Sequence, residues 1–255
     1  MHPTFDLFFF DVPLYTALVV LGAVSGLIVT FAFLRTRARR AARVTIFLDG
    51  ALIVLAAGWI GARAYHVALH WDYYVTRPDE IAQIGLGGLA MRGAFLTGLA
   101  ALAFYARVRG LLFARLADAG ALGLCVGQAI GWAGALSWGA NYGVISDSPI
   151  ALDLPDAYGL IAPRFPLQYF EIGLFVCLFV GLVVLAGYHP PAGTLFLAYW
   201  GVSAAAQCAL GALRGDETLL VLGWRFDQIV DALFTAVVGG IVIARSARSR
   251  TDVAI

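Results

Sequence analysis

The sequence predicts an all-α polytopic membrane protein with seven transmembrane helices. Of its 255 residues, 61% are hydrophobic and only 13% are charged, whereas a soluble domain usually carries about a quarter charged residues. The apolar residues fall in blocks of about 20, the length that a helix needs to cross the hydrocarbon core of a bilayer. We therefore expect one integral membrane domain over residues 1–255.

The apolar blocks predict where each helix lies. The first block is not a cleaved signal peptide, because it is about 23 residues long and ends in a basic cluster. Two long connections, residues 71–88 and 140–168, contain aromatic residues and prolines and are expected to be interfacial arms. In chain order the predicted spans are Val12–Leu34, Ile46–Leu69, Leu89–Val108, Ala117–Trp138, Tyr169–Gly187, Thr194–Leu213 and Phe226–Ala244.

The distribution of arginine predicts the orientation of the helices. All 17 basic residues are arginine, and 11 of them lie in "RTRARRAAR" after the first span, "RVRGLLFAR" after the third and "RSARSR" in the tail. Positive loops remain on the cytoplasmic side of a membrane. The N-terminus is therefore expected outside and the C-terminus in the cytoplasm, with both interfacial arms facing outward, which requires an odd number of spans.

Several ionisable side chains are predicted to lie at membrane depth, where they are costly and suggest function. Arg63, Arg92 and Glu171 all fall toward the outward half of their spans. A guanidinium offers a fork of donors that matches phosphate oxygens, so these residues suit an anionic lipid headgroup. Structural roles remain open as alternatives: Arg63 paired with Glu171 between helices, and Arg92 extended to outer-leaflet phosphates.

Five blocks in order resemble the prolipoprotein diacylglyceryl transferase family. The span count and orientation are similar to that family as well, and the resemblance covers residues 13–243, nearly the whole chain. The blocks are "GARAYHV" from Gly61, "GGLAMRG" from Gly87, "GWAGALSWGANYG" from Gly131, "FPLQYFE" from Phe165 and "LRGDE" from Leu213.

The resemblance implies an activity and a set of site residues. Members of the family transfer the diacylglyceryl group of phosphatidylglycerol to the thiol of a prolipoprotein lipobox cysteine. Such a reaction needs cations to hold the phosphate and a base to form the thiolate. The matching positions predict Glu171, Arg92 and His66 as catalytic residues. The predicted substrate-binding residues are Arg63, Tyr65, Gly87, Gly88, Gly134, Gly139, Tyr142, Gly143, Gln168, Arg214 and Gln228.

The chain departs from the family pattern at polar positions. Trp132 occupies the position of an arginine, and Ala135 and Trp138 occupy those of two asparagines. Counted back from Arg214, Gln207 and Gly211 stand where the family has an arginine and a glutamate, whereas counting from "YWG" places Ala204 and Cys208 there. Loss of charged groups from a catalytic site lowers the rate by orders of magnitude. Whether the chain is an enzyme is therefore left open. The first possibility is a transferase, with full or impaired activity. The alternatives are a catalytically inactive paralogue that binds phospholipid or lipoprotein segments, and a small membrane transporter or scaffold.

The remaining expectations concern partners and location. The expected partners are phosphatidylglycerol or another anionic phospholipid, the signal segment of a prolipoprotein, and the membrane itself. We expect no metal, no cofactor and no nucleic acid, because the sequence has no Gly-rich phosphate loop with lysine and no HExxH. The expected location is the bacterial cytoplasmic (inner) membrane, crossed several times.

Overall fold

A computed structural model describes the chain as two compact units, each treated separately below. Unit 1 comprises Met1–Thr30 and Asp118–Ile255, and unit 2 comprises Phe31–Ala117. Part of the predicted arm 71–88 lies outside the described residues, which are 4–7, 10–38, 40–83 and 87–253.

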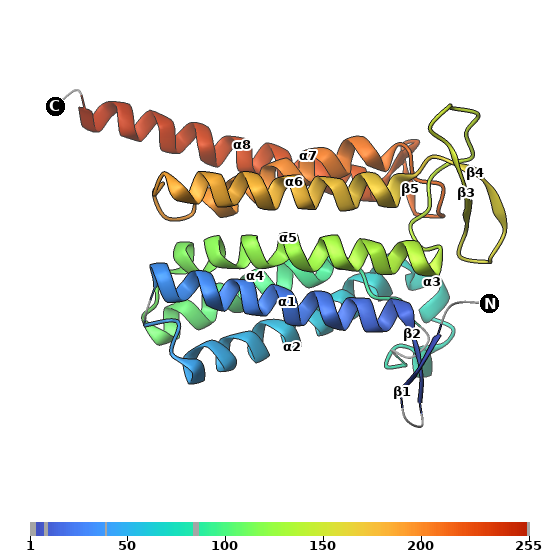
Figure 1. Cartoon of the computed structure of the whole chain (residues 1–255), viewed down its shortest axis with the longest axis horizontal. Helices are drawn as coiled ribbons and strands as arrows, with labels where there is room; N and C mark the ends of the chain where they lie inside the picture. Colours follow the sequence, from blue (N-terminus) through green and yellow to red (C-terminus); the bar gives the residue numbers. More distant parts are fainter. Residues whose placement is uncertain (1–3, 8–9, 39, 84–86, 254–255) are drawn as a thin grey trace. The chain divides into compact units, whose positions relative to one another are not determined.

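Unit 1 is formed by long helices that carry short hairpins (Figure 1). The helices α1 and α5 contribute residues to both units. The helices of unit 1 are α1 (Leu14–Arg37), α5 (Phe113–Trp138), α6 (Leu167–Gly187), α7 (Thr194–Gly211) and α8 (Phe226–Val253). The antiparallel hairpins are β1–β2 (Thr4–Leu7, Phe10–Pro13), β3–β4 (Leu152–Pro155, Ile161–Arg164) and β5–β6 (Leu220–Val221, Trp224–Arg225).

Unit 2 is a helical pair with a structured connection. Its two long helices, α2 (Val44–Leu69) and α4 (Met91–Arg109), are joined through α3 (Trp71–Tyr74) and the 3-10 helix η1 (Pro78–Glu80). The pair packs closely because Gly61 and Gly93 leave no side chain between the helices: a Cβ on Gly93 would lie 2.4 Å from the carbonyl oxygen of Gly61. The hydroxyl of Thr97 donates across the contact to the carbonyl of Ala57 at 2.9 Å.

The predicted all-α polytopic membrane fold is confirmed. Among the described residues, six helices are long and apolar enough to cross a membrane, and they correspond to six of the predicted spans. The other predicted span, Leu89–Val108, is helix α4, which carries Arg92, Arg107 and Arg109 and is not one of the six. The count of seven and the orientation therefore stay predictions. The predicted arm 140–168 contains the hairpin β3–β4, for which no strand was expected.

Glycines bring α1 and α5 into backbone contact within unit 1. Gly22 and Gly26 face Gly127 and Gly123, each pair of glycines being four residues apart. A Cβ on Gly26 would lie 2.7 Å from the carbonyl oxygen of Gly123, and one on Gly22 2.8 Å from that of Gly127. Small residues at this spacing allow close helix association in membranes. Each of the two helices thus contributes a G-x-x-x-G motif to this contact, and both motifs can be read in the sequence.

Replacing Gly123 with alanine should loosen this helix contact. The new methyl would meet the Thr30 hydroxyl at 2.1 Å and the Gly26 carbonyl oxygen at 2.4 Å, so backbone must shift. Overpacking of this kind costs about 1–3 kcal/mol. Denaturant unfolding in micelles should show that loss, whereas Gly131→Ala, on the same helix with nothing within 4 Å of the added Cβ, should leave stability unchanged. Equal effects would show that the contact carries no stability.

Candidate functional site

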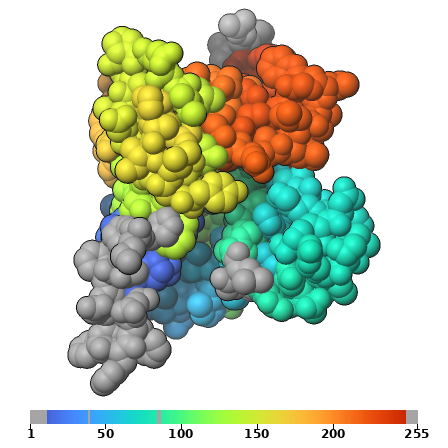
Figure 2. Space-filling model, turned by 90° about the vertical axis from the view of Figure 1, so that its right-hand side faces the viewer, coloured from blue at the N-terminus to red at the C-terminus, as the bar shows by residue number. Residues whose placement is uncertain are grey.

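The glycine-rich segment that follows α5 lies at one end of unit 1 and is hydrogen-bonded there to two other loops. The amide of Val144 donates to the carbonyl of Leu213 at 2.9 Å, and the amide of Phe165 donates to the carbonyl of Val144 at the same distance. This single residue therefore joins the chain before α6 to the chain after α7. Looking onto this end, Figure 2 shows residues 140–165 in yellow-green to yellow beside residues 212–226 in orange.

The predicted glycines permit this close packing of backbones. Gly139 has φ of +70°, and a Cβ there would lie 2.3 Å from the carbonyl oxygen of Asp156. A Cβ on Gly143 would lie 2.1 Å from the carbonyl oxygen of Phe165. Gly134, deeper in α5, faces the backbone of Tyr15 on α1 at 3.3 Å. These glycines have a clear structural role, and their predicted contact with substrate stays a prediction.

A buried ion pair fixes the hairpin β3–β4 against this segment. Arg164 donates to the Oδ2 of Asp156 at 2.9 Å, with both side chains less than a tenth exposed. The other oxygen of Asp156 accepts from the amides of Tyr158 and Leu160. The guanidinium carbon of Arg164 lies 4.5 Å from the ring centre of Tyr142. Burial, together with the charge of Asp156, raises the pKa of Tyr142, so this phenol stays neutral at physiological pH.

Arg214, a predicted substrate-binding residue, is held by a carboxylate and an amide. Its Nε and Nη2 donate to the two oxygens of Asp216 at 2.9 and 2.6 Å, and Nη2 also donates to Asn141 at 2.8 Å. Burial lowers its pKa, but the bonds and charge of Asp216 outweigh burial and raise the pKa. Arg225 donates to the same carboxylate at 3.2 Å. Two arginines therefore share one aspartate, and the group keeps a net positive charge.

A buried polar cluster surrounds Glu171, near the start of α6. The side chains of Glu171 and Gln168 are each only 1% exposed. Gln207 on α7 donates through Nε2 to a carboxylate oxygen of Glu171 at 3.0 Å. Gln168 donates to the carbonyl of Ala140 at 3.1 Å, and among the described residues its Oε1 has no donor. The cluster thus offers a carboxylate and a buried acceptor.

At the positions predicted to depart from the family pattern, the residues pack against neighbouring side chains. Trp138 lies beside Tyr15 on α1, with ring centres 6.1 Å apart, and Ala135 is 4% exposed. Gly211 leaves room for Gln228, whose Cγ would be 2.6 Å from a Cβ at that position. Gln228 itself donates to the carbonyl of Cys208 at 3.0 Å. A glutamate at position 211 would therefore require Gln228 to move.

Arg63 binds the connection between α2 and α4. Its Nε donates to the carbonyl of Ile81 at 2.8 Å, and its two terminal nitrogens donate to four further carbonyls at distances of 2.7–3.3 Å. A guanidinium has five N–H donors, which is the number of these bonds. The side chain is 7% exposed. The four carbonyls belong to Glu80, Gln83, Gly87 and Gly88.

The other predicted residues of unit 2 lie around Arg63 and at the start of α4. Gly88 has φ of +79°, and a Cβ there would be 2.6 Å from both Arg63 Nη1 and His66 Nε2. The His66 ring lies 4.2 Å from that of His70. Gly87, also at positive φ, precedes Gly88. Tyr65 packs at Gly93, and Arg92 is the second residue of α4, partly exposed.

The structure brings the predicted residues together in two groups, one in each unit. Glu171 and Gln168 form the first group, with Gln228 and Arg214 nearby on α8 and after α7; Arg63, His66 and Gly88 are the core of the second. The pairing of Arg63 with Glu171 would join the two units and stays a prediction. Sequence reasoning missed Asn141, Asp216 and Arg225, although the acid two residues after Arg214 was a visible signal. Among the described residues, no three His, Cys, Asp or Glu side chains are grouped to hold a metal ion.

Comparisons with known proteins identify the family of the chain. A family model described as prolipoprotein diacylglyceryl transferase matches residues 3–245. The chain is 30% identical over 244 residues to the phosphatidylglycerol–prolipoprotein diacylglyceryl transferase of Bacillus licheniformis, covering 92% of this chain and 89% of that protein. It is 27% identical over 244 residues to the protein of the same name from Clostridioides difficile, covering 93% and 92%. The chain therefore belongs to the prolipoprotein diacylglyceryl transferase family.

Proposed function

We propose that this multi-pass membrane protein transfers the diacylglyceryl group of phosphatidylglycerol to the lipobox cysteine of prolipoproteins in the bacterial cytoplasmic membrane. A thioether C–S bond forms, the C–O bond between the diacylglyceryl carbon and the phosphate breaks, and glycerol phosphate leaves. The thiol proton must go to a base. Family membership over nearly the whole chain and the names of the relatives support this reaction.

The buried carboxylate of Glu171 is the observation that carries the proposal. It belongs to a matched family block and is 1% exposed. A positioned carboxylate is able to act as a general base for a thiol. Gln207 orients it through a hydrogen bond of 3.0 Å. Glu171 is thus suited to accept the thiol proton.

Cationic groups are required to stabilise the leaving phosphate. Arg214 and Arg225 share Asp216 and together supply positive charge at the end of unit 1. Arg92 supplies a further guanidinium at the start of α4. In this proposal His66, close to Gly88, assists the thiol, and the glycines admit the lipid backbone.

A second candidate function is lipid binding without chemistry. All five donors of Arg63 are used by backbone carbonyls. Trp132 and Trp138 replace polar groups of the family. A site of this kind would retain phosphatidylglycerol or a lipoprotein segment but release no glycerol phosphate.

Complementation separates the two functions. The chain is expressed in cells depleted of their own transferase, and prolipoprotein is examined by gel shift and mass. A diacylglyceryl adduct on the lipobox cysteine is the expected result. A folded, membrane-inserted chain that leaves prolipoprotein unmodified, yet purifies with phosphatidylglycerol, would overturn the transferase proposal and establish the binding function.

A further inference from the structure

The hairpin β5–β6, which connects α7 to α8, exposes an apolar surface at one end of unit 1. Residues 218–224 carry no charge. A contiguous exposed apolar patch is informative, because segments that lie in water usually present polar side chains. The large apolar residues of this segment that are more than two-fifths exposed are Leu219, Leu220, Leu222 and Trp224.

The turn at the tip of the hairpin contains a leucine where turns favour other residues. Val221 pairs with Trp224, so Leu222 and Gly223 form a two-residue loop, with φ values of +53° and +82°. Such a loop favours asparagine, aspartate or glycine, because a larger L-residue crowds its own backbone at positive φ. Leu222 is 95% exposed, so packing within the chain does not offset this cost. A compensating contact must come from outside the chain.

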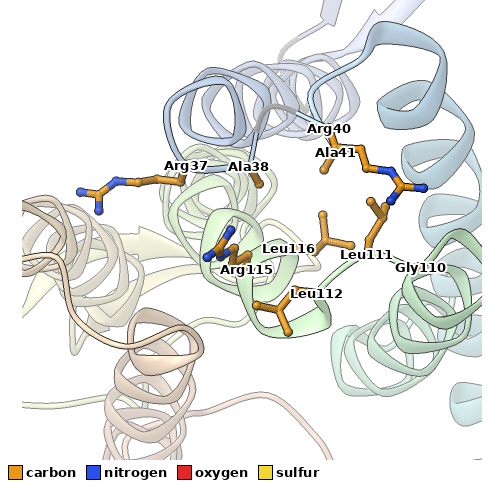
Figure 3. Close-up of a pocket in the computed structure, with 9 residues that line it drawn as sticks. All are labelled: Arg37, Ala38, Arg40, Ala41, Gly110, Leu111, Leu112, Arg115 and Leu116. Carbon is orange, nitrogen blue, oxygen red and sulfur yellow. The ribbon is translucent and has the colours of Figure 1, made fainter.

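The charges around the hairpin are confined to its base. The connection after α1 is different, because Figure 3 shows Arg37, Arg40 and Arg115 around a cavity where α1 ends and α5 begins. At the base of the hairpin, Arg225 donates to the carboxylate of Asp216 at 3.2 Å. The hairpin therefore has an ion-paired base and an uncharged apolar tip, as expected of a segment that enters a membrane interface.

The hairpin lies where its tip is able to reach lipid. Helices α7 and α8 are both long and apolar enough to cross a membrane, so the segment that joins them starts and ends at the membrane surface. In Figure 1, β5 lies close to the ends of α6 and α7, whereas β3 and β4 extend farther from the helices. Leu222 precedes Phe226, the first residue of α8, by four residues, which span at most about 14 Å. Ile229 and Leu233 on α8 are exposed as well, so the apolar surface continues from the helix to the hairpin.

We propose that the tip of β5–β6 inserts into the leaflet at this end of unit 1, at the boundary between headgroups and acyl chains. Leu220 and Leu222 contact the first methylenes of the lipid, and Trp224 lies among the headgroups, where its amphipathic ring is favoured. Contact with lipid offsets the conformational cost of Leu222. Because Arg214 and Arg225 flank the hairpin, this anchor holds both arginines at the depth of the headgroups. The anchor does not depend on the proposed transfer reaction.

The test measures the depth of position 222 in vesicles that contain the purified full-length chain. The variant Leu222→Cys carries an environment-sensitive fluorophore in a Cys177→Ser background, because Cys177 is itself exposed. The vesicles consist of phosphatidylcholine, which is not the proposed transfer substrate, with a share of phosphatidylcholine spin-labelled on its acyl chain. The spin-labelled lipid should quench the fluorophore. Iodide should quench it at least about threefold less than at a position in water, because the acyl layer excludes a charged quencher.

Two reference positions calibrate the measurement. Asp147→Cys, in the same background, places the fluorophore on an exposed loop residue and should be quenched by iodide alone. Cys177 of the unaltered chain is exposed within the candidate span of α6 and should be quenched by the lipid alone. The labelled Cys177→Ser chain without an added cysteine gives the background from Cys125 and Cys208.

The variant Leu222→Asn separates the requirement of the turn from that of the lipid. Asparagine is favoured in this turn, so a hairpin in water should become more stable, whereas an anchored hairpin should be released. The amide of Phe226, bonded to the carbonyl of Leu219 at 2.9 Å, reports the difference. In vesicles, its hydrogen exchange in the variant should be at least about threefold faster than in the unaltered chain.

Three results would overturn the proposal. Quenching of the label at position 222 by iodide alone would place the hairpin in water. Protection from both quenchers would show that protein, such as a second copy of the chain, covers the tip. Unchanged or slower exchange at Phe226 in Leu222→Asn would show that lipid does not hold the hairpin.

Discussion

Replacing Glu171 with glutamine is expected to lower the rate of diacylglyceryl transfer by at least about 100-fold, because removal of a general base costs about 10²–10⁴ in rate. The substitution preserves the shape of the side chain, which is 1% exposed and bonded to Gln207. An amide is able to accept that bond but not a proton from the thiol. Transfer is measured as thioether product with purified chain, phosphatidylglycerol and a lipobox peptide.

The control for this change is Glu217→Gln, which removes the same charge from an exposed loop residue. Its transfer rate should equal that of the unaltered chain. Retained transfer in Glu171→Gln, with bound phosphatidylglycerol unchanged, would contradict the role of Glu171 as base. A chain in which both variants bind lipid and neither forms product would instead support lipid binding without chemistry.

Gln207 shows what the sequence was able to predict about this site and what it was not. From the sequence alone it is predicted to stand in place of an arginine of the family. In the structure it donates to Glu171, 36 residues earlier in the chain. That contact depends on how α6 packs on α7, and no residue pattern was recognised on these two helices that indicates their packing. Gln207 therefore supplies a hydrogen-bond donor to the carboxylate of Glu171.

The helices themselves were predictable because each apolar block has the length of a membrane span. Short hairpins such as β3–β4 were not, because their four-residue strands carry little pattern of their own and are held by a buried ion pair and by backbone bonds to the segment after α5. The ion pair of Arg214 was partly predictable, because Asp216 follows two residues later in the sequence. Arg63 was identified as an unusual charge at membrane depth. Its partners are backbone carbonyls, which every residue carries and which leave no signature in a sequence.

Arg63→Gln is therefore expected to release the connection between α2 and α4. Each hydrogen bond to a charged group contributes about 1.5–3 kcal/mol, and glutamine is too short and has too few donors to replace five. We expect the connection to lose at least about 3 kcal/mol of local stability, equivalent to amide hydrogen exchange about 100-fold faster. The reporting amides are those of Glu80, Ile81 and Gln83, which are bonded within the connection.

Two comparison variants test whether Arg63 holds the connection between α2 and α4 or binds the phosphate of the lipid. Arg77→Gln removes a charge from the same connection, where that guanidinium only covers the ring of Tyr73 at 4.4 Å, and should leave exchange unchanged. Arg63→Lys keeps the charge but offers three donors without the fork, so it should accelerate exchange nearly as much as glutamine. Slow exchange in both Arg63 variants, with loss of phosphatidylglycerol binding in the glutamine variant alone, would show that Arg63 acts through its charge on the lipid. Fast exchange in both would assign Arg63 to holding the connection between α2 and α4 rather than to binding the phosphate.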